Sequence, residues 1–169
     1  MKKLQTIFIP LILLIILVGA KAPNPPAKTS SLEIKGYVYI GDDKVNDAEV
    51  RLYQDNKIVQ KAITKKSKFQ FILFSDMRYM VEVHKDGYVT ERIQISTKEK
   101  TEFAGKYLYE FKVDLMSLKK FKGVDISSLD FPTAIIKYDA KEGEYLHDLS
   151  YSQQVKDELK KLKTEAKKK

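Results

Sequence analysis

The sequence predicts a mainly β protein, a seven-stranded antiparallel β-sandwich followed by one C-terminal α-helix. Apolar and polar residues alternate along several short segments, and turn-forming residues separate these segments at regular intervals. This pattern is typical of a sandwich rather than of βαβ units. From residue 150 onward the apolar spacing becomes that of a helix. The predicted strands are 32–40, 48–53, 57–64, 68–74, 78–84, 88–96 and 107–115.

The hairpin made by 78–84 and 88–96 is the clearest pair of strands. A period of two places its apolar residues on one face, as a half-buried strand requires. These residues are Tyr79, Val81, Val83, Val89, Ile93 and Ile95. Lys85-Asp86-Gly87 supplies the turn, because glycine adopts the positive φ angle that tight turns need.

The other strands follow the same alternation. In the first strand, Leu32, Ile34, Tyr37 and Tyr39 are the inward-facing candidates, and Gly36 predicts a β-bulge. The remaining inward residues are Ala48, Val50, Leu52, Phe69, Phe71, Leu73, Tyr107, Tyr109, Phe111, Val113 and Leu115. Together the strands define a domain at 32–116, long enough to bury its own core.

The segment 117–149 differs from the strands before it, because its apolar residues follow no regular period. We expect it to extend along the sandwich and to carry the helix with it. A short strand is predicted at 131–138, and Pro132 places that strand at a sheet edge, because proline cannot donate to a β-ladder.

Residues 150–169 predict an amphipathic helix with a basic tail. Tyr151, Val155 and Leu159 begin a single apolar stripe, and Ser150 or Ser152 is the expected N-cap. An isolated helix of this length is marginal in water, so its stripe needs a surface to cover. We expect these three residues to dock on the protein's own sandwich, while 162–169 frays into solvent.

The N-terminus predicts export. Residues 1–20 combine Lys2 and Lys3, an apolar run and a small-residue end at Ala20, which is the pattern of a cleaved signal peptide. The alternative is an uncleaved membrane anchor, which would be the chain's only membrane contact. A proline-rich linker follows at 21–31. We expect a periplasmic location, or an extracellular or outer-membrane-associated one.

Composition excludes several classes of function. The chain has no cysteine, so lipoprotein anchoring, disulfides and thiol chemistry are excluded. Its net charge of +8 gathers partly in the C-terminal lysines. Such a tail can contact nucleic acid, anionic lipid or acidic glycans, but a solvated helix end is the simpler interpretation, and nucleic acid is not expected for an exported protein.

Residues 32–97 resemble the carboxypeptidase regulatory-like, transthyretin-like sandwich family, an immunoglobulin-like architecture. The resemblance rests on Ile34-Lys35-Gly36-Tyr37-Val38, on Asp47 to Tyr53, on Lys68-Phe69-Gln70-Phe71 and on Tyr79 to Tyr88. It departs from the family at Val45-Asn46-Asp47 and at Lys65-Lys66-Ser67, where the usual turn residues are replaced. The resemblance implies a non-catalytic module of exported and outer-membrane proteins, frequently from Bacteroidota, and it brings no active site.

No motif in the sequence predicts a catalytic, cofactor or metal site. His84 and His147 lie in different segments, whereas zinc needs three or four closely spaced ligands. Asp42, Asp43 and Asp47 lack the glycine and glutamate of a calcium loop and are best interpreted as a solvated turn. A cross-link among Lys35, Glu82 and Asp114 is a remote alternative, because all three are predicted to face outward. We therefore expect no enzyme and no cofactor.

The predicted function is binding or assembly in the cell envelope, with a protein as the expected partner. The alternative is carbohydrate recognition by a tyrosine-bearing sheet face, because aromatic rings stack on sugars. The residues predicted for either surface are Tyr37, Tyr39, Tyr53 and Tyr88. The absence of tryptophan counts against the carbohydrate alternative.

Overall fold

The computed structural model describes residues 30–98 and 105–168, so the predicted signal peptide and most of the predicted linker lie outside the described residues. The described strands are β1 (Ser31–Ile40), β2 (Asp43–Lys44), β3 (Glu49–Gln54), β4 (Lys57–Ile63), β5 (Lys68–Phe74), β6 (Arg78–His84), β7 (Glu91–Ser96), β8 (Lys106–Asp114), β9 (Ala134–Asp139) and β10 (Glu144–His147). The helices are the 3-10 helices η1 (Leu118–Phe121) and η2 (Ser127–Asp130), and α1 (Leu149–Lys168).

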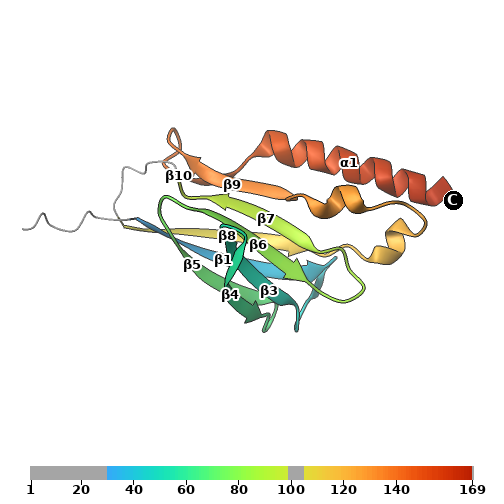
Figure 1. Cartoon of the computed structure of the whole chain (residues 1–169), viewed down its shortest axis with the longest axis horizontal. Coiled ribbons are helices and arrows are strands. Elements are labelled where there is room, and N and C mark those ends of the chain that lie inside the picture. The colour runs from blue at the N-terminus through green and yellow to red at the C-terminus, as the bar shows by residue number, and fades with distance from the viewer. Residues whose placement is uncertain (1–29, 99–104, 169) are drawn as a thin grey trace, which may run out of the picture.

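These strands form two sheets packed face to face, with α1 beside β9 (Figure 1). Sheet A has β1 at its centre, with β8 on one side and β5 and β2 on the other. Sheet B has the order β10-β9-β7-β6-β3-β4. The predicted class, a β-sandwich with a C-terminal helix, is confirmed.

Two details of that prediction are wrong. The described part of the chain contains ten strands rather than seven, because β2, β9 and β10 join the sheets. The sandwich is also not wholly antiparallel, since β1 pairs with β8, and β7 with β9, in parallel. Parallel neighbours need a long connection between them, and the segments 41–105 and 97–133 supply these connections.

The core lies between the inner faces of the two sheets. Sheet A contributes the fully buried Leu32, Ile34, Val38 and Leu73, and sheet B contributes Val50, Leu52, Val81, Val83, Ile95 and Ile136. The predicted inner faces of β3, β5, β6 and the C-terminal half of β8 are therefore confirmed.

The first strand differs from its prediction. The register of β1 with β5 and β8 runs without interruption through Gly36, so no bulge occurs there. Gly36 faces inward, and an added Cβ atom would lie 2.0 Å from Cζ of Phe69. The glycine thus makes room for an aromatic ring. Because the alternation continues unbroken, Tyr37 and Tyr39 point outward, contrary to the expectation.

Two hairpin turns use residues that tolerate positive φ. Asp55 and Asn56 have φ angles of 48° and 61°, and Lys66 and Ser67 have 51° and 67°. Two consecutive positive φ angles match the twist of the flanking strands, as in a type I′ turn. In the adjoining pair of strands, β3 and β4, the register shifts between Leu52 and Tyr53.

The segment 117–149 contains η1, η2, β9 and β10, so it is more structured than expected. Pro132 precedes β9, which lies inside sheet B between β7 and β10 rather than at an edge. Tyr138 of β9 and Tyr145 of β10 meet Tyr107 of β8, with ring centroids 5.5–5.6 Å apart. These rings close one side of the sandwich.

The helix begins one residue earlier than predicted, at Leu149, and its cap is Asp148 rather than Ser150 or Ser152. The Asp148 carboxylate accepts hydrogen bonds from Ser150 Oγ (2.7 Å) and from the backbone N–H of Tyr151 (3.1 Å). These bonds hold the pKa of Asp148 well below its usual range. Lys137 of β9 lies 3.0 Å from the same carboxylate and connects the cap to sheet B. No helix in the described part of the chain is long and apolar enough to cross a membrane.

Candidate functional site

The outer face of sheet A is the candidate binding surface. The register places outward residues of β5, β1 and β8 side by side in rows across the sheet. Three rows follow one another: Phe74, Ser31 and Lys106; Ile72, Glu33 and Leu108; and Gln70, Lys35 and Glu110. Rows of this kind are the unit in which sheet surfaces interact with their neighbours.

Three large apolar side chains in these rows are exposed. Ile72 is 45 %, Leu108 55 % and Phe74 66 % exposed. Ile72 and Leu108 flank Glu33 from opposite sides, and Phe74 occupies the next row. We call these three residues the apolar row. They occupy outward strand positions, which usually hold polar residues, and so make part of the outer face of sheet A apolar.

Glu33 lies between the apolar side chains and is nearly buried, although it belongs to the outer face. Lys106 forms an ion pair with its carboxylate, Lys35 approaches to 3.5 Å, and Gln70 Nε2 donates to it at 2.8 Å. The hydrogen bond from Lys106 is the main cause that lowers the pKa of Glu33, and it outweighs the opposing effect of burial. The charge in the centre of this face is thus held by neighbouring strands.

The structure brings together two of the four predicted surface tyrosines. Tyr37 and Tyr39 both lie on the outer face of sheet A, and Tyr37 donates to Glu110 Oε2 at 3.2 Å. Burial and this hydrogen bond raise the pKa of Tyr37. Lysine amines lie 5.5 Å from the two ring centroids, Lys68 over Tyr37 and Lys112 over Tyr39, in a cation–π geometry.

The other two predicted tyrosines lie elsewhere. Tyr53 is on the outer face of sheet B, where it pairs with Met80 of β6. Tyr88 precedes β7, which begins only at Glu91, and it bridges to Ser117 and packs partly against the core. The four residues therefore do not form one surface.

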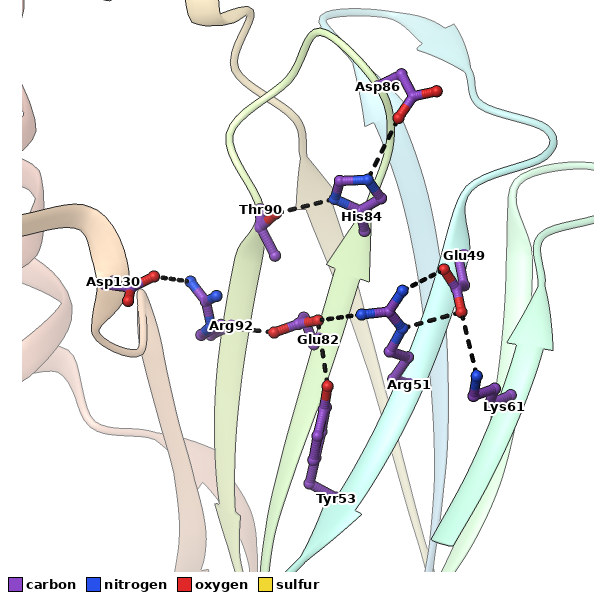
Figure 2. A network of polar contacts seen from close by, with 10 residues as sticks. All are labelled: Glu49, Arg51, Tyr53, Lys61, Glu82, His84, Asp86, Thr90, Arg92 and Asp130. Carbon is purple, nitrogen blue, oxygen red and sulfur yellow. Dashed lines mark hydrogen bonds and ion pairs between the residues drawn. The ribbon is translucent and has the colours of Figure 1, made fainter. Parts of the chain in front are cut away.

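The outer face of sheet B carries a chain of alternating charges, drawn in Figure 2. Arg51 binds Glu49 through two hydrogen bonds, of 2.9 and 2.6 Å, and its Nη1 atom lies 3.3 Å from Glu82. Glu82 also pairs with Arg92 at 3.2 Å, and Arg92 in turn pairs with Asp130 of η2 at 2.9 Å. We call this the charge network.

The network satisfies its own charges. Lys61 lies 3.7 Å from Glu49, and the Tyr53 hydroxyl donates to Glu82 at 3.4 Å (Figure 2). The hydrogen bond from Arg51 lowers the pKa of Glu49, and the bond to Glu49 raises the pKa of Arg51. Each carboxylate of the charge network is thus paired with a neighbouring cation, an arrangement that links the strands of sheet B to one another.

The two histidines are far apart in the fold. His84 of β6 lies 3.1 Å from Thr90 Oγ1 and 3.4 Å from Asp86 at the edge of the charge network (Figure 2). His147 of β10 contacts the Tyr109 hydroxyl, and burial lowers the pKa of its imidazole. Within residues 30–98 and 105–168, no three or more His, Cys, Asp or Glu side chains gather as metal ligands.

The residues of the cross-linking alternative are also separated. Lys35 and Asp114 lie on the outer face of sheet A, whereas Glu82 belongs to the charge network on sheet B. Lys35 contacts Glu33 and Glu110, and Asp114 accepts a hydrogen bond from the backbone N–H of Gly41 at 2.9 Å. This arrangement does not support the cross-link.

Two of the three residues predicted for helix docking make apolar contacts with the rest of the protein. Val155 is buried, and Leu159 packs against a small cluster formed by Val89, Phe121 and Leu129. The Tyr151 hydroxyl donates to the carbonyl oxygen of Pro132 at 2.5 Å. Leu162 packs against the same cluster, so the helix continues in contact beyond the point where fraying was expected.

Sequence reasoning missed the apolar row. The alternation that places Phe71 and Leu73 inside also places Ile72 and Phe74 outside, so this half of the signal was present. What the alternation does not give is the partner of each strand. Only the parallel pairing of β1 with β8 brings Leu108 beside Glu33 and completes the row.

Comparison with known proteins adds partial fold likenesses. No family model matches the chain, and no curated protein matches it either. Among solved structures, the Bacillus anthracis TIE protein has a TM-score of 0.41 and 22 % identity, with 52 % of this chain and 16 % of that chain covered. A putative membrane-associated protein of unknown function from Bacteroides fragilis gives 0.39 and 16 %, covering 53 % and 29 %.

A third solved structure, a DUF3823 family protein from Parabacteroides merdae, has a TM-score of 0.37 and 16 % identity. It is covered to 47 %, against 52 % of this chain. The chain thus spans less than half of the length of each of these three proteins. The likeness is confined to about half of this chain and concerns its fold alone.

Proposed function

We propose that the protein is a non-catalytic, exported module of the carboxypeptidase regulatory-like type, which binds a protein partner in the cell envelope through the outer face of sheet A. The signal-peptide pattern of residues 1–20 and the family resemblance of residues 32–97 support the compartment and the type of module. The paired charges of the charge network support a non-catalytic role, because Glu49, Arg51, Glu82, Arg92 and Asp130 already hold one another in ion pairs.

The apolar row is the observation that carries this proposal. Exposed apolar residues that occur singly are normal, whereas adjoining ones mark interaction sites. Ile72 and Leu108 stand on either side of Glu33, and Phe74 adjoins Ile72 in the next row. A protein partner that covers this face removes three large apolar side chains from water, which is favourable in proportion to the area buried.

Charged groups at the margin of the apolar row favour a protein partner of mixed character. Lys106 and Lys35 reach across it to Glu33, and Glu110 lies in the adjoining row. Protein–protein interfaces combine apolar side chains with polar and charged groups, and here the charges, Glu33 among them, lie between and beside the apolar side chains. The charged groups give orientation and specificity, while the apolar side chains favour binding through the area that they bury.

Carbohydrate binding is the second candidate, and it rests on Tyr37 and Tyr39. Both rings lie on the outer face of sheet A. Tyr37 also lines a hollow of about 380 Å³, together with Lys35, Gly36, Lys68, Phe69 and Gln70. However, lysine amines already stand over both rings. A sugar that stacks on either ring has to displace such an amine, so we rank this candidate second.

Site-specific photo-cross-linking in the producing cells tests the first proposal. A photoreactive residue at position 72 or 108 is expected to give one discrete protein adduct. The same residue at position 59 of β4 is the matched control, because Val59 is 47 % exposed and Ile72 is 45 % exposed. Ile72→Glu in the protein labelled at position 108 should abolish the adduct, because it introduces an unpaired charge at the centre of the interface.

The carbohydrate candidate predicts a different result. Affinity electrophoresis through gels of envelope polysaccharides should retard the protein, and Tyr37→Ala should remove the retardation. Equal adducts from positions 59, 72 and 108, or no adduct from 72 and 108, would contradict the protein-binding proposal. Retardation that depends on Tyr37 would then assign the same face to carbohydrate.

A further inference from the structure

The positive charge of the protein is concentrated in one region. Helix α1 and residues 118–122, which include η1, together contain nine lysines and three acidic residues. The chain has a net charge of +8, so these two segments account for most of its excess. Residues 30–117 and 123–148, which hold the two sheets and their other connections, contain 17 basic and 20 acidic residues and are slightly negative as a whole.

The fold brings these lysines from two separate segments to the same end of the molecule. Phe121 of η1 is buried against Leu159 and Leu162, so η1 lies beside the C-terminal half of α1 (Figure 1). Residues 156, 160, 163 and 167 of α1 recur at spacings of four, three and four, so their side chains share one side of the helix. All four are lysines.

We call six of these residues the lysine surface: Lys119, Lys120 and Lys122 near η1, and Lys156, Lys160 and Lys167 of α1. Lys163 is only half-exposed, and its charge acts on Glu91, a carboxyl whose pKa is raised by burial, so Lys163 belongs partly to the protein interior. Along α1, a hollow of about 390 Å³ is lined by four lysines, Leu159 and Thr164, with no acidic residue.

Several lysines on the sheets have acidic partners, which the lysine surface lacks in the part of the chain that the structure describes. Lys35, Lys61, Lys106 and Lys137 each form an ion pair. Within the described ranges, no residue of the lysine surface forms one. Like charges gathered without counter-charges raise the free energy of the free protein, and an anionic ligand removes that repulsion.

We propose that the lysine surface binds anionic phospholipid headgroups at a membrane of the cell envelope. A group of four to eight lysines on an amphipathic helix is the usual electrostatic basis of such binding. Lysine is a compact point charge that needs no fixed geometry in its partner, which suits a fluid array of phosphates. This contact does not depend on residues 1–20, whether they are cleaved or remain as a membrane anchor.

The apolar residues of this region also favour a lipid surface over an acidic glycan. Leu118, beside Lys119, is 40 % exposed and can enter the headgroup region, where amphipathic elements bury their apolar side chains. Residues 117–122 and 156–168 expose no aromatic ring, because Phe121 is buried. A platform for stacking sugar rings is therefore absent from these residues.

Vesicle co-sedimentation of the chain from Lys21 onward tests the proposal without residues 1–20. This form keeps every described strand and helix, and the buried residues all lie at Leu32 or later. We expect sedimentation with vesicles of phosphatidylcholine mixed with phosphatidylglycerol, and none with phosphatidylcholine alone. Added salt should weaken binding, because exposed charges are screened at high ionic strength.

Triple substitutions locate the binding surface. K119Q/K120Q/K122Q and K156Q/K160Q/K167Q should each lower the partition coefficient about tenfold or more, since each lysine near an anionic surface contributes about 1 kcal/mol. K57Q/K65Q/K66Q is the matched control, because it removes the same charge from the β3–β4 and β4–β5 hairpins. Circular dichroism verifies that all three variants are folded.

Three results would overturn the proposal. Equal binding to both kinds of vesicle would show that charge does not direct it. An equal loss in the control variant would show that net charge, rather than this surface, is responsible. Retention on an immobilised acidic polysaccharide, without vesicle binding, would assign the lysine surface to glycans.

Discussion

The outer faces of the two sheets differ in how far their side chains are paired with one another or exposed to solvent. On sheet B, the charge network links four strands and η2 through matched ion pairs, from Lys61 to Asp130. On sheet A, Glu33 is similarly paired, but Ile72, Phe74 and Leu108 stand exposed around it, whereas the exposed large apolar residues of sheet B, Ile58, Val59 and Ile63, all lie on the single strand β4. Both faces belong to one sandwich and share one core, so the difference lies in what each face presents to solvent.

This contrast distinguishes side chains that stabilise a sheet from side chains that are free to bind a partner. A network of partly buried, mutually paired charges stabilises its own sheet and offers little to a partner, because its hydrogen bonds are already made. Exposed apolar side chains contribute little to stability until something covers them. We therefore expect substitutions on the outer face of sheet B to affect folding and those in the apolar row to affect binding.

The largest effect is predicted for the inner face of sheet A, at Gly36. Gly36→Ala places a Cβ atom 2.0 Å from Cζ of Phe69, whose ring also packs between Phe71 and Phe111. Because the Phe69 ring is buried and already packed against Phe71 and Phe111, we expect a loss of about 2–3 kcal/mol in the free energy of unfolding, as for overpacked cores. Urea denaturation measures it.

The double variant Gly36→Ala/Phe69→Leu is the test of this cause, because leucine lacks the atoms that clash and should recover part of the loss. Gly41→Ala serves as the control, since nothing lies within 4 Å of its added Cβ and only its φ of +61° is strained. We expect about 1 kcal/mol there. An equal loss at both glycines would show that backbone strain, rather than Phe69, determines the requirement at Gly36.

The next effect compares one glutamate from each outer face. Glu82→Gln removes the charge that accepts from Arg51, Arg92 and Tyr53, and we expect a loss of about 1–2 kcal/mol for this partly buried network. Glu110→Gln removes a more exposed charge beside Lys35 and Tyr37, and we expect at most about 0.5 kcal/mol. Urea denaturation midpoints of the two variants measure these losses. A larger loss of stability for Glu110→Gln than for Glu82→Gln would contradict the prediction that the charge network stabilises its sheet more.

Sequence alone predicts the inner faces well where every second residue is large and apolar. Phe69, Phe71 and Leu73 of β5 maintain the alternation without a gap, and so do Tyr79, Val81 and Val83 of β6. In β1 the inward position 36 is a glycine, so no apolar side chain marks this position as inward and the alternation cannot be followed through it. The tyrosines at 37 and 39 were therefore placed on the wrong face, with a bulge to accommodate them.

Strand partners were less predictable than strand faces. The register that joins Arg51 to Glu82 and Glu82 to Arg92 depends on which strands are neighbours, and no local pattern encodes this. Strand β10 has only Tyr145 fully buried, too short a signal for a period of two. The charge network and the apolar row both arise from pairing across strands, so both required the fold.

A smaller effect concerns acid. The pKa of Glu33 is lowered in the folded protein, chiefly by the hydrogen bond from Lys106, so its contribution to stability is full above its unfolded pKa of about 4.3. As the pH falls below this value and through the lower folded pKa, the contribution is lost. Glu49 on sheet B behaves in the same direction because of Arg51.

Glu33→Gln and Glu49→Gln should therefore each flatten the decline of the urea midpoint as the pH is lowered from about 5 to 3. The two faces are predicted to respond alike here, because both glutamates are stabilised as anions by a neighbouring cation. A Glu33→Gln variant whose profile runs parallel to that of the unaltered protein would show that Lys106 does not hold this carboxylate.

The smallest effect is predicted for the apolar row itself. Ile72→Thr and Leu108→Thr keep residues suited to strands and remove apolar surface that is already half in water, so we expect changes within about 0.5 kcal/mol. The adjacent Leu73 is fully buried, and Leu73→Ala should cost about 2–5 kcal/mol. Both Thr variants should lose the photo-cross-linked adduct while they keep their urea midpoints. A loss above about 1.5 kcal/mol for either Thr variant would mean that the row stabilises sheet A, and its exposure would then no longer indicate a partner.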